Sequence, residues 1–525
     1  MDPLLTINKF QTLQSEKTRE DQIENNAGGY VFEVDTLQRA LRFLILGTDG
    51  GTYYTSERSL TKDNANFIIE LANSDEGIKL VDLLVDVSLK GRASRQNPTL
   101  FTLAVCVSST NEKVKSHALE NINSVCRTAT MLFQFIAYVE NLRGWGRALK
   151  KGVANWYLTK DINDLAYQII KYRNRHGFTH RDVLRLSHPK TDDGNLANLF
   201  RWTVGKEYGE DLPEIIDSFI QVQTKDVRLK VVLKEINKGK LPWEAIPTEL
   251  LNEHAVWDEL LPHIGLTALI RNLSRLSSIG YIKPLKDISK ITALFTDENI
   301  KRSRLHPLNV AVALRTYDSG RGFRGSLTWE VNTDIVDLLN KVLIKSFNNV
   351  ESTNKRTLIA LDVSGSMSNG NVCNSFLRPI DAEAILAMSM VKSEPKIHTM
   401  AFSGELVQFP IYKNSTMKEV LKQIDRMDFG GTDCSLPMIY AQKNNIEVDT
   451  FIIMTDNETW AGKIHPFEAL KQYRKSSGIN ARLVVIGMTS TKFTIADPTD
   501  KGMLDVVGMD TSVPELIASF SKQEF

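Results

Sequence analysis

The chain has 525 residues and a formal net charge of +1, and 42% of its residues are hydrophobic and 24% charged. A chain of this length is too long for one hydrophobic core, so we expect at least two domains. The composition excludes collagen, coiled coil and general disorder, and the near-zero charge excludes a uniformly basic nucleic-acid binder, although local charged surfaces stay open.

The sequence has no recognisable targeting segment or membrane span. Its first residues, MDPLLTINKF, lack the basic start and apolar core of a secretory signal. The longest apolar stretch, residues 129–139, is interrupted by Gln134 and is far shorter than the ~20 residues that a membrane span needs. We therefore expect a soluble intracellular protein with no membrane partner. The four cysteines lie far apart without metal-ligand spacing, which predicts buried thiols.

From about residue 36 to 348 the apolar residues recur at steps of three and four, as they do on one face of an α-helix. Leu80, Leu84 and Val87 form one such stripe. Many helices of medium length joined by short loops favour an α-solenoid of HEAT-like helical hairpins over one compact bundle. The sequence has no strict period, which degenerate repeats of this kind do not require.

One part of this helical stretch, residues 141–190, concentrates positive charge. It contains eleven lysines and arginines against three aspartates, a net charge of +8, so the rest of the chain sums to −7. Tryptophan, tyrosine and histidine side chains stand among the cations and offer surfaces on which unpaired bases stack. We therefore predict a single-stranded RNA surface. Its candidate contacts are Lys171, Arg175, His180, Arg181, Arg185 and His188.

Other interpretations of this basic segment stay open. Most charge runs are solvated helix faces, but such faces usually mix both signs, and here most cations have no local carboxylate. The histidines can also form a metal cluster, although no cysteine or acidic residue accompanies them at ligand spacing. His188, which precedes Pro189, can equally end a helix.

Around residues 348–356 the chain becomes polar, and after it short apolar runs alternate with helical patterns. We place a domain boundary there, between residues 1–355 and residues 356–525. Helices at about 381–392, 416–427, 435–443, 466–475 and 513–521 separate most of the predicted strands. The strands are expected at 357–361, 398–402, 406–411, 451–455 and 483–486. This alternation predicts an α/β domain with a mainly parallel, doubly wound sheet, whose functional loops lie at the carboxyl ends of the strands.

The first predicted strand is followed by LDVSGSM, which places Asp362, Ser364 and Ser366 at alternating positions. Thr432 in FGGTDCS and Asp456 in FIIMTDNE follow later, where this fold would bring them to the same place. Carboxylate and hydroxyl oxygens are hard ligands, and few carboxylates with several hydroxyls suit Mg²⁺. We predict one divalent cation, Mg²⁺, bound by these five side chains.

Three alternatives to a metal-dependent binding site are weaker. A tight turn also selects Asp, Ser and Gly, but it does not explain the later Thr and Asp in the correct order. An aspartyl-nucleophile phosphatase needs a second carboxylate where this chain has Ser364, and a two-metal nuclease needs more clustered acidic residues. The sequence contains no phosphate loop, nucleophile elbow or HExxH pair. We therefore predict no catalytic residues and a site that captures the carboxylate or phosphate oxygen of a partner.

The helical stretch carries FLILGTDGGTYY and RDVLRLSHPK, and the later part carries LDVSGSM, GGTD and MTD in this order. With these motifs nearly the whole chain resembles the family of 60-kilodalton SS-A/Ro ribonucleoproteins, the Ro autoantigens. The N-terminal part is similar to the TROVE module of telomerase-associated and vault-associated proteins. The C-terminal part is similar to a von Willebrand factor A domain with its metal-ion-dependent adhesion site. The resemblance implies that Asp362, Ser364, Ser366 and Thr432 contact the metal directly or through water, and Asp456 mainly through water.

The resemblance also implies a ring of HEAT-like repeats that the A domain closes around a positively charged hole. Family members bind Y RNAs on the outer surface and single-stranded 3′ ends of misfolded noncoding RNAs in the hole. The implied role is noncoding RNA quality control and Y RNA stabilisation, in the cytoplasm and in a nuclear pool. The alternative function is a metal-dependent protein-interaction scaffold, which binds a protein ligand that offers an acidic side chain to the metal site.

Overall fold

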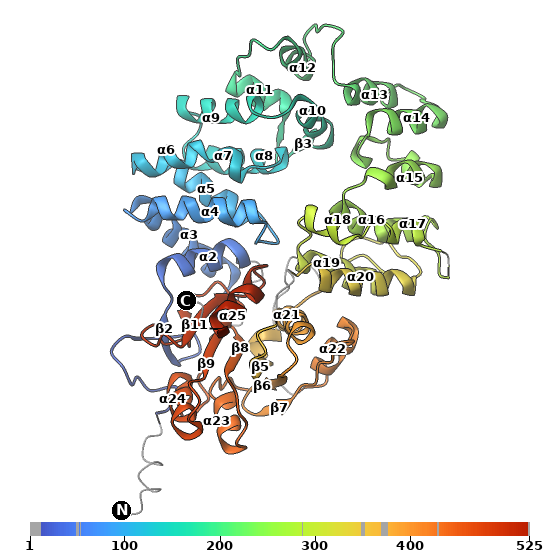
Figure 1. The fold of residues 1–525 in the computed structure, drawn as a ribbon. Coiled ribbons are helices and arrows are strands. Elements are labelled where there is room, and N and C mark those ends of the chain that lie inside the picture. The colour runs from blue at the N-terminus through green and yellow to red at the C-terminus, as the bar shows by residue number, and fades with distance from the viewer. Residues whose placement is uncertain are drawn as a thin grey trace, which may run out of the picture.

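The structure is a computed structural model and describes residues 12–48, 52, 54–285, 287–347, 352–368, 376–427 and 430–522. A helical region, residues 36–345, is followed by a C-terminal α/β domain, residues 357–522 (Figure 1). This order confirms the predicted fold class. No helix in the described ranges has both the length and the apolar character needed to cross a bilayer. Cys106, Cys126 and Cys434 are buried free thiols, and Cys373 lies outside the described residues.

The helices of the helical region follow one another closely along the chain. Their bounds are α2 (Thr36–Leu46), α3 (Glu57–Asn73), α4 (Gly77–Lys90), α5 (Asn97–Val107), α6 (Glu112–Glu120), α7 (Ile122–Val125), α8 (Ala129–Leu142), α9 (Arg147–Leu158), α10 (Ile162–Lys171), α11 (His180–Ser187), α12 (Gly194–Val204), α13 (Glu214–Val222), α14 (Leu229–Gly239), α15 (His254–Leu260), α16 (Leu266–Ser278), α17 (Ser289–Thr292), α18 (Asp297–Arg302), α19 (Pro307–Asp318) and α20 (Thr333–Lys345). A two-stranded hairpin, β3 (Asn174–Arg175) and β4 (Phe178–Thr179), stands between α10 and α11.

Local sequence signals explain where these helices begin, end and pack. Asp161 precedes α10, and its side chain accepts hydrogen bonds from two backbone N–H groups of the first turn. Gly205 ends α12 at φ 73°, a left-handed conformation that glycine adopts without strain. The predicted stripe of Leu80, Leu84 and Val87 is fully buried on α4. The apolar spacing therefore identified the faces through which the helices pack.

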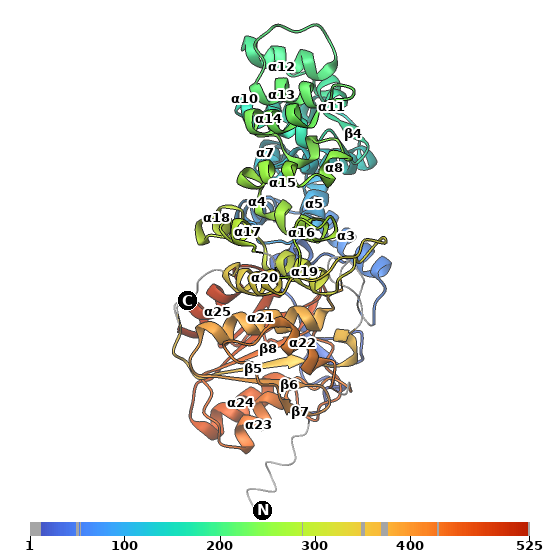
Figure 2. The ribbon, with the colours of Figure 1, turned by 90° about the vertical axis from the view of Figure 1, so that its right-hand side faces the viewer.

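The helical region follows a closed path that begins and ends on the C-terminal domain. Figure 1 shows the chain leaving this domain along α2 to α11, turning at α12 and α13, and returning along α14 to α20. In the view turned by 90°, α12 lies at the end of the molecule farthest from the sheet (Figure 2). We call α2 to α11 the first arm and α14 to α20 the second arm, and both contact the C-terminal domain. Arg42 of α2 pairs with Asp505 at 2.5 Å, and Asn340 of α20 accepts a hydrogen bond from the Met417 N–H at 3.2 Å.

The two arms also meet each other near the C-terminal domain, at Arg92 in the loop between α4 and α5. The carbonyl oxygen of Arg92 lies 3.1 Å from the Nε2 of His306, which precedes α19 in the other arm. The guanidinium of Arg92 pairs with Asp510 of the C-terminal domain at 2.6 Å. This one residue therefore connects both arms and the C-terminal domain.

The C-terminal domain contains a six-stranded sheet in the order β11-β9-β8-β5-β6-β7, in which β7 alone is antiparallel to its neighbour. The strands are β5 (Thr357–Asp362), β6 (Ile397–Phe402), β7 (Leu406–Gln408), β8 (Thr450–Thr455), β9 (Arg482–Gly487) and β11 (Met503–Val507). The helices are α21 (Pro379–Ser393), α22 (Met417–Ile424), α23 (Leu436–Lys443), α24 (Pro466–Ser477) and α25 (Val513–Lys522), with the 3₁₀ helix η4 (Gly365–Ser368) after β5. Every predicted strand and helix of this domain is present.

Residues of β5 alternate between two apolar cores, as expected for a strand that is covered on both faces. Leu358 and Ala360 belong to the core under α23 and α24. Ile359 and Leu361 belong to the core that contains α21 and α25, and that core continues into the helical region. The helical region and the α21 face of the sheet are therefore packed as one apolar unit.

Residues 14–33 precede the helical region in sequence but pack on the C-terminal domain, which the sequence patterns did not indicate. There β1 (Gln22–Glu24) pairs with β2 (Tyr30–Glu33), and β2 pairs with β10 (Phe493–Thr494) in a small antiparallel sheet. The side-chain amide of Gln14 donates to Asp433 at 2.8 Å and to the Ile464 carbonyl at 2.9 Å. This N-terminal segment thus supports the loops beside the predicted metal site.

Candidate metal centre and basic surface

The predicted metal ligands lie at the carboxyl end of the sheet, where β5 and β8 run side by side and parallel. Asp362 ends β5, and its Oδ1 accepts the Ser364 N–H at 2.9 Å. The hydroxyl oxygens of Ser364 and Ser366 are 3.0 Å apart. Asp456 directly follows β8, and the Ser366 side chain hydrogen-bonds to it. The parallel pairing therefore brings these four side chains into one cluster.

Thr432 lies on a neighbouring loop that is held against the loop after β8. Its carbonyl oxygen accepts the N–H groups of Trp460 at 3.1 Å and of Ala461 at 3.0 Å. The preceding Gly431 leaves room for this approach, because a Cβ there would lie 3.0 Å from the Trp460 ring. The Thr432 side chain is buried. All five predicted ligands thus stand on loops that meet at one end of the sheet.

The two aspartates of this centre are buried without a compensating positive charge from the protein. Asp362 is 0% and Asp456 is 1% exposed. Burial, with the Asp456 charge as the next cause, raises the pKa of Asp362 to about 7, and burial also raises the pKa of Asp456. Within the described ranges, no lysine or arginine forms an ion pair with either aspartate.

The arrangement fits a divalent cation, because two buried carboxylates and nearby hydroxyl oxygens provide negative charge and hard ligands together. Among the residues that the structure describes, no group of three or more His, Cys, Asp or Glu side chains is placed to hold a metal. A cation here therefore depends on serine and threonine oxygens as well as on the carboxylates. The same finding gives no support to a histidine metal cluster in the described part of the basic segment.

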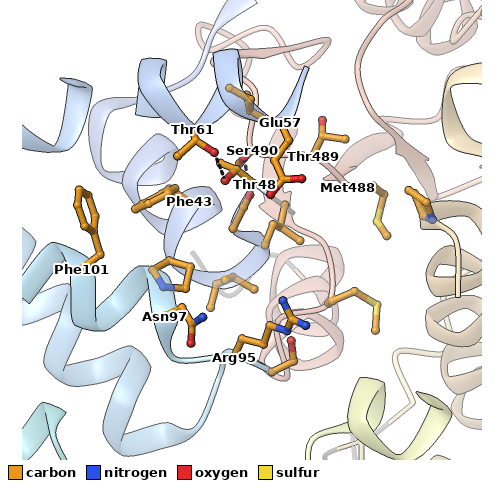
Figure 3. A pocket seen from close by; sticks show the side chains of 18 of the residues that line it. Phe43, Thr48, Glu57, Thr61, Arg95, Asn97, Phe101, Met488, Thr489 and Ser490 are labelled. Carbon is orange, nitrogen blue, oxygen red and sulfur yellow. Dashed lines mark hydrogen bonds between the residues drawn. The ribbon is translucent and has the colours of Figure 1, made fainter. Parts of the chain in front are cut away.

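A cavity of about 480 Å³ lies between the helical region and this end of the sheet (Figure 3). Phe43 and Phe101 contribute an apolar wall, and hydroxyl side chains, including those of Thr61 and Ser490, line another part. Thr489, which also lines the cavity, donates a weak hydrogen bond of 3.4 Å to the Asp456 carbonyl. The cavity therefore borders a loop of the metal centre.

The basic segment forms the end of α10, the β3–β4 hairpin and α11. Arg175 is exposed on the hairpin. Arg181 and Arg185 are exposed on α11, one turn apart, and His188 is exposed just after this helix. Lys171 is half-buried, with its Nζ 5.2 Å from the centre of the Tyr167 ring. Five of the six predicted contacts are thus reachable by solvent and lie on consecutive elements.

His180 corrects the prediction, because it is a core residue and cannot contact RNA. Its side chain is 2% exposed, its Nδ1 lies 3.0 Å from the Tyr157 hydroxyl, and its ring meets the Phe133 ring edge-on at 4.9 Å. Burial lowers the pKa of His180 to about 3. Helical spacing in the sequence indicates this burial. His180 stands three and four residues before the apolar Val183 and Leu184, so it lies on the same face of α11, and both of those residues are buried.

His188 has the alternative role that its position before Pro189 suggested. It adopts a left-handed conformation, φ 49°, at the end of α11, and its N–H donates to the Leu184 carbonyl at 3.0 Å. Its ring is nevertheless exposed. A helix-ending backbone and an exposed ring are compatible, so the predicted contact stays a prediction.

Two of the arginines approach the end of another helix. The Arg181 guanidinium packs against Gly205, and Arg185 donates a long hydrogen bond of 3.4 Å to the Val204 carbonyl at the end of α12. A guanidinium has five N–H donors, so one such contact leaves donors for a ligand. Arg201 and Lys206 are exposed at the same helix end. The sequence pattern does not indicate these two cations, because only the fold brings the end of α12 next to α11.

The cations of this surface form no ion pair in the described part of the chain, although the Glu244 carboxylate acts on Lys171 at longer range. Within those residues, no carboxylate lies within 4.0 Å of the charged nitrogens of Lys171, Arg175, Arg181, Arg185 or Lys190. One of the three aspartates of the segment, Asp182, accepts the Thr179 N–H at the start of α11. The local positive charge inferred from the sequence therefore persists in the fold. We call Lys171, Arg175, Arg181, Arg185 and His188 the basic surface.

Comparisons with known proteins cover nearly the whole chain. The model of the TROVE domain matches residues 23–210 and 228–322, and the model described as the Ro60 vWA domain matches residues 356–521. The RNA-binding protein RO60 of Caenorhabditis elegans is 35% identical over 97% of this chain and 91% of its own length. The RNA-binding protein RO60 of Deinococcus radiodurans is 37% identical over 99% of both chains. A crystal structure of the Deinococcus radiodurans RO (RSR) protein matches with 36% identity and a TM-score of 0.70, over 94% of this chain and 100% of that one.

Proposed function

Since the chain belongs to the Ro60 family, with a TROVE domain followed by a Ro60 vWA domain, we propose that it is the RNA-binding protein of a small ribonucleoprotein. Its RNAs are Y RNAs and misfolded noncoding RNAs with a single-stranded 3′ end. Its role is noncoding RNA quality control and Y RNA stabilisation, in the cytoplasm and a nuclear pool. The relatives named above as RNA-binding proteins support the class of ligand.

The observation that carries this proposal is the basic surface, whose cations form no ion pair with a carboxylate among the described residues. Arginine binds phosphate oxygens through its fork of N–H groups, and such contacts fix a nucleic acid in place without reading its sequence. Tyr167 and Tyr172 lie beside the Lys171 ammonium at 5.2 and 5.6 Å from their ring centres. Aromatic faces beside phosphate-binding cations suit an unpaired strand better than a duplex.

The metal centre has a separate role in this proposal. Asp362, Ser364, Ser366, Thr432 and Asp456 would hold one Mg²⁺, and the cation would offer a position to an acidic oxygen of a protein ligand. The two uncompensated aspartates and the hydroxyl oxygens beside them support this assignment. The chain's part is to fix these oxygens through the hydrogen bonds of its loops. We assign no catalytic residue to the centre, because its ligand set lacks the acidic residues of a two-metal nuclease.

A second function, a metal-dependent scaffold that binds acidic peptides, is favoured by one observation. The cavity of about 480 Å³ beside the Asp456 loop has the size of a ligand pocket and lies at a domain junction, where such pockets are frequent. In this alternative the basic surface attracts the same acidic partner. The two functions differ in the ligand of the basic surface, which is RNA in the first and an acidic peptide in the second.

Sequencing the RNA that copurifies with the full-length protein tests the proposed function and names the ligand. Y RNAs and noncoding RNAs with unpaired 3′ ends are expected to be enriched. A gel shift then compares one structured RNA with and without a free 3′ tail, with an acidic peptide as competitor. Enrichment of no RNA, together with displacement by the peptide, would replace RNA binding with the scaffold function. Incubation of the RNA with the protein and Mg²⁺ should yield no cleavage products.

A further inference from the structure

A second cavity, of about 500 Å³, lies where the two arms meet, and its volume is typical of small-ligand sites. Lys90 at the end of α4 lines it from the first arm, and Lys301 of α18 and Lys345 of α20 line it from the second. Figures 1 and 2 show α4 and α18 at the same level on opposite arms. Arg304, in the loop after α18, is the fourth cation of the lining, and Asp297 is the one carboxylate among the described lining residues. Positive charge therefore dominates this cavity.

The few carboxylates at this cavity are already engaged by two of its four cations. Asp297 pairs with Lys345 at 2.6 Å, and Asp86 of α4 pairs with Lys90 at 2.5 Å. The other two cations of the lining have no carboxylate within 4.0 Å of their charged nitrogens in the described part of the chain. Glu298 of α18 is not among the lining residues. The second arm thus presents two free charges to the cavity.

A further arginine without an ion pair approaches this cavity from the first arm. Arg127, between α7 and α8, is half-buried, and its Nε donates to the Ser88 hydroxyl of α4 at 3.2 Å. Gly91 follows α4, and a Cβ at Gly91 would lie 3.5 Å from the Cβ of Arg304, so the two arms touch here. Burial and the charge of Arg304 lower the pKa of Arg127. Two guanidinium groups from different arms therefore repel each other, which a bound anion would relieve.

We propose that this cavity binds a small ligand that carries two or more phosphate groups, and that the ligand bridges the two arms. Guanidinium and ammonium groups are common partners of phosphate oxygens. Cations on both arms favour a ligand with several phosphates, because one phosphate does not neutralise both walls. The aromatic lining residues, His306 and Phe347, are buried, so they offer no stacking faces to the bases of an RNA strand. The site is separate from the basic surface and does not depend on RNA binding.

A bridging ligand would strengthen the junction between the arms. His306, which lines the cavity, is the residue whose Nε2 lies 3.1 Å from the Arg92 carbonyl of the first arm. Repulsion between the cations opposes this contact, whereas a shared anion attracts the cations of both arms. The bound ligand therefore holds the arms together more firmly.

The test uses the full-length protein after removal of RNA and divalent cations, titrated with inorganic triphosphate by isothermal titration calorimetry. Replacing Lys301 with Gln and Arg304 with Asn together should weaken binding at least about 10-fold, because each change removes a charge-assisted contact. Asparagine suits position 304, where φ is 47°. Lys90→Gln should weaken binding by a smaller factor, because Asp86 already pairs with Lys90.

The matched control is Arg302→Gln, which removes a charge of the same helix that does not line the cavity. It should bind triphosphate like the unaltered chain. Triphosphate should also raise the unfolding temperature of the unaltered chain and leave that of the double variant Lys301→Gln/Arg304→Asn unchanged. Without triphosphate, the double variant should unfold at the same temperature or a higher one, because it has lost repelling charges.

Four outcomes would contradict the proposal. Equal triphosphate affinity in the unaltered chain and the double variant would overturn the site, and a loss of binding in Arg181→Ala/Arg185→Ala would move it to the basic surface. Unchanged affinity in Lys90→Gln would overturn the bridge between the arms. Inorganic phosphate that binds as tightly as triphosphate would overturn the need for several phosphates. Displacement of triphosphate by an unpaired RNA without a terminal phosphate would assign the cavity to the RNA backbone.

Discussion

The helical region and the C-terminal domain present their predicted site residues in opposite ways. Arg175, Arg181 and Arg185 are exposed on a hairpin and a helix, whereas Asp362 and Asp456 are enclosed at the end of a sheet. Exposed charges are screened by salt and contribute little to stability. Buried charges remain strong and are costly until a counter-charge arrives. Ionic strength should therefore control the first site, and the supply of a cation the second.

The largest effect is expected from lowering the pH, because the helical region contains buried histidines that should make it sensitive to acid. His306 joins the two arms: its Nδ1 accepts the Leu308 N–H and its Nε2 lies 3.1 Å from the Arg92 carbonyl, so the ring is bonded as the neutral form. Burial lowers the pKa of His306 to about 4 and that of His180 to about 3, from an ordinary value of 6.5.

For both histidines the folded chain binds a proton less readily than the unfolded chain. Their contribution to stability is complete above pH 6.5 and is lost as the pH falls toward the folded values. Keeping each ring neutral at pH 5 should lower the free energy of unfolding by about 2 kcal/mol relative to its value above pH 6.5. Hydrogen–deuterium exchange should show faster exchange in α8 to α11 and α19 at pH 5 than at pH 7, after correction for the intrinsic pH dependence. Unchanged protection there would mean that these rings accept protons without unfolding.

A second prediction separates packing from ligand contact within the basic segment. His180→Ala removes a buried ring between Tyr157 and Phe133 and should lower the free energy of unfolding by about 3 kcal/mol. RNA affinity, measured well below the unfolding temperature, should stay the same. His117→Ala, at a half-buried histidine that pairs with an exposed aspartate, is the control and should cost less than about 1 kcal/mol. A loss of RNA binding in folded His180→Ala would return this residue to the site.

Salt provides the sharpest contrast between the two regions. If each of four cations of the basic surface neutralises one phosphate of an unpaired strand, RNA affinity should fall about 50-fold between 50 and 200 mM salt. Mn²⁺ binding at the enclosed centre should change far less over the same range, because burial limits screening. Filter binding and a Mn²⁺ titration on the same protein measure both. An RNA affinity that does not respond to salt would argue against phosphate contacts at this surface.

The difference between the regions also explains what the sequence predicted well. The C-terminal domain follows local rules: apolar runs form its strands, and the DxSxS loop must lie where β5 ends, so Asp362 and Ser366 could be placed in advance. Strand β11 was not predicted, because Asp505 places a charge in the middle of its short apolar run. That charge is accommodated only by its ion pair with Arg42 of α2, which is distant in the sequence. Contacts between distant segments, such as Gln14 with Asp433, have no local signal.

In the helical region the residue types of the basic surface were visible, but their orientation was not. The alternation of buried and exposed positions on α11 separates His180 from Arg181, and charge composition alone ignores that alternation. Arg201 and Lys206 were invisible for another reason, because they reach the surface through the packing of α12 on α11. Composition identifies a charged segment, whereas helical phase and tertiary contacts decide which of its side chains can bind.

The smallest effect is expected from removing the two cations that α11 contributes to the basic surface. Replacing Arg181 and Arg185 together with alanine removes two exposed cations and should weaken RNA binding about 10-fold, because each charge-assisted contact to phosphate is lost while others remain. Stability should change by less than about 1 kcal/mol, since both side chains are exposed and their contacts with α12 are weak. Arg426→Ala, at an exposed arginine of the C-terminal domain, is the matched control and should leave RNA binding unchanged. If the control weakens binding as much as the double variant does, the RNA responds to the net charge of the whole chain, and the contrast between an exposed cationic surface and an enclosed metal centre loses its meaning.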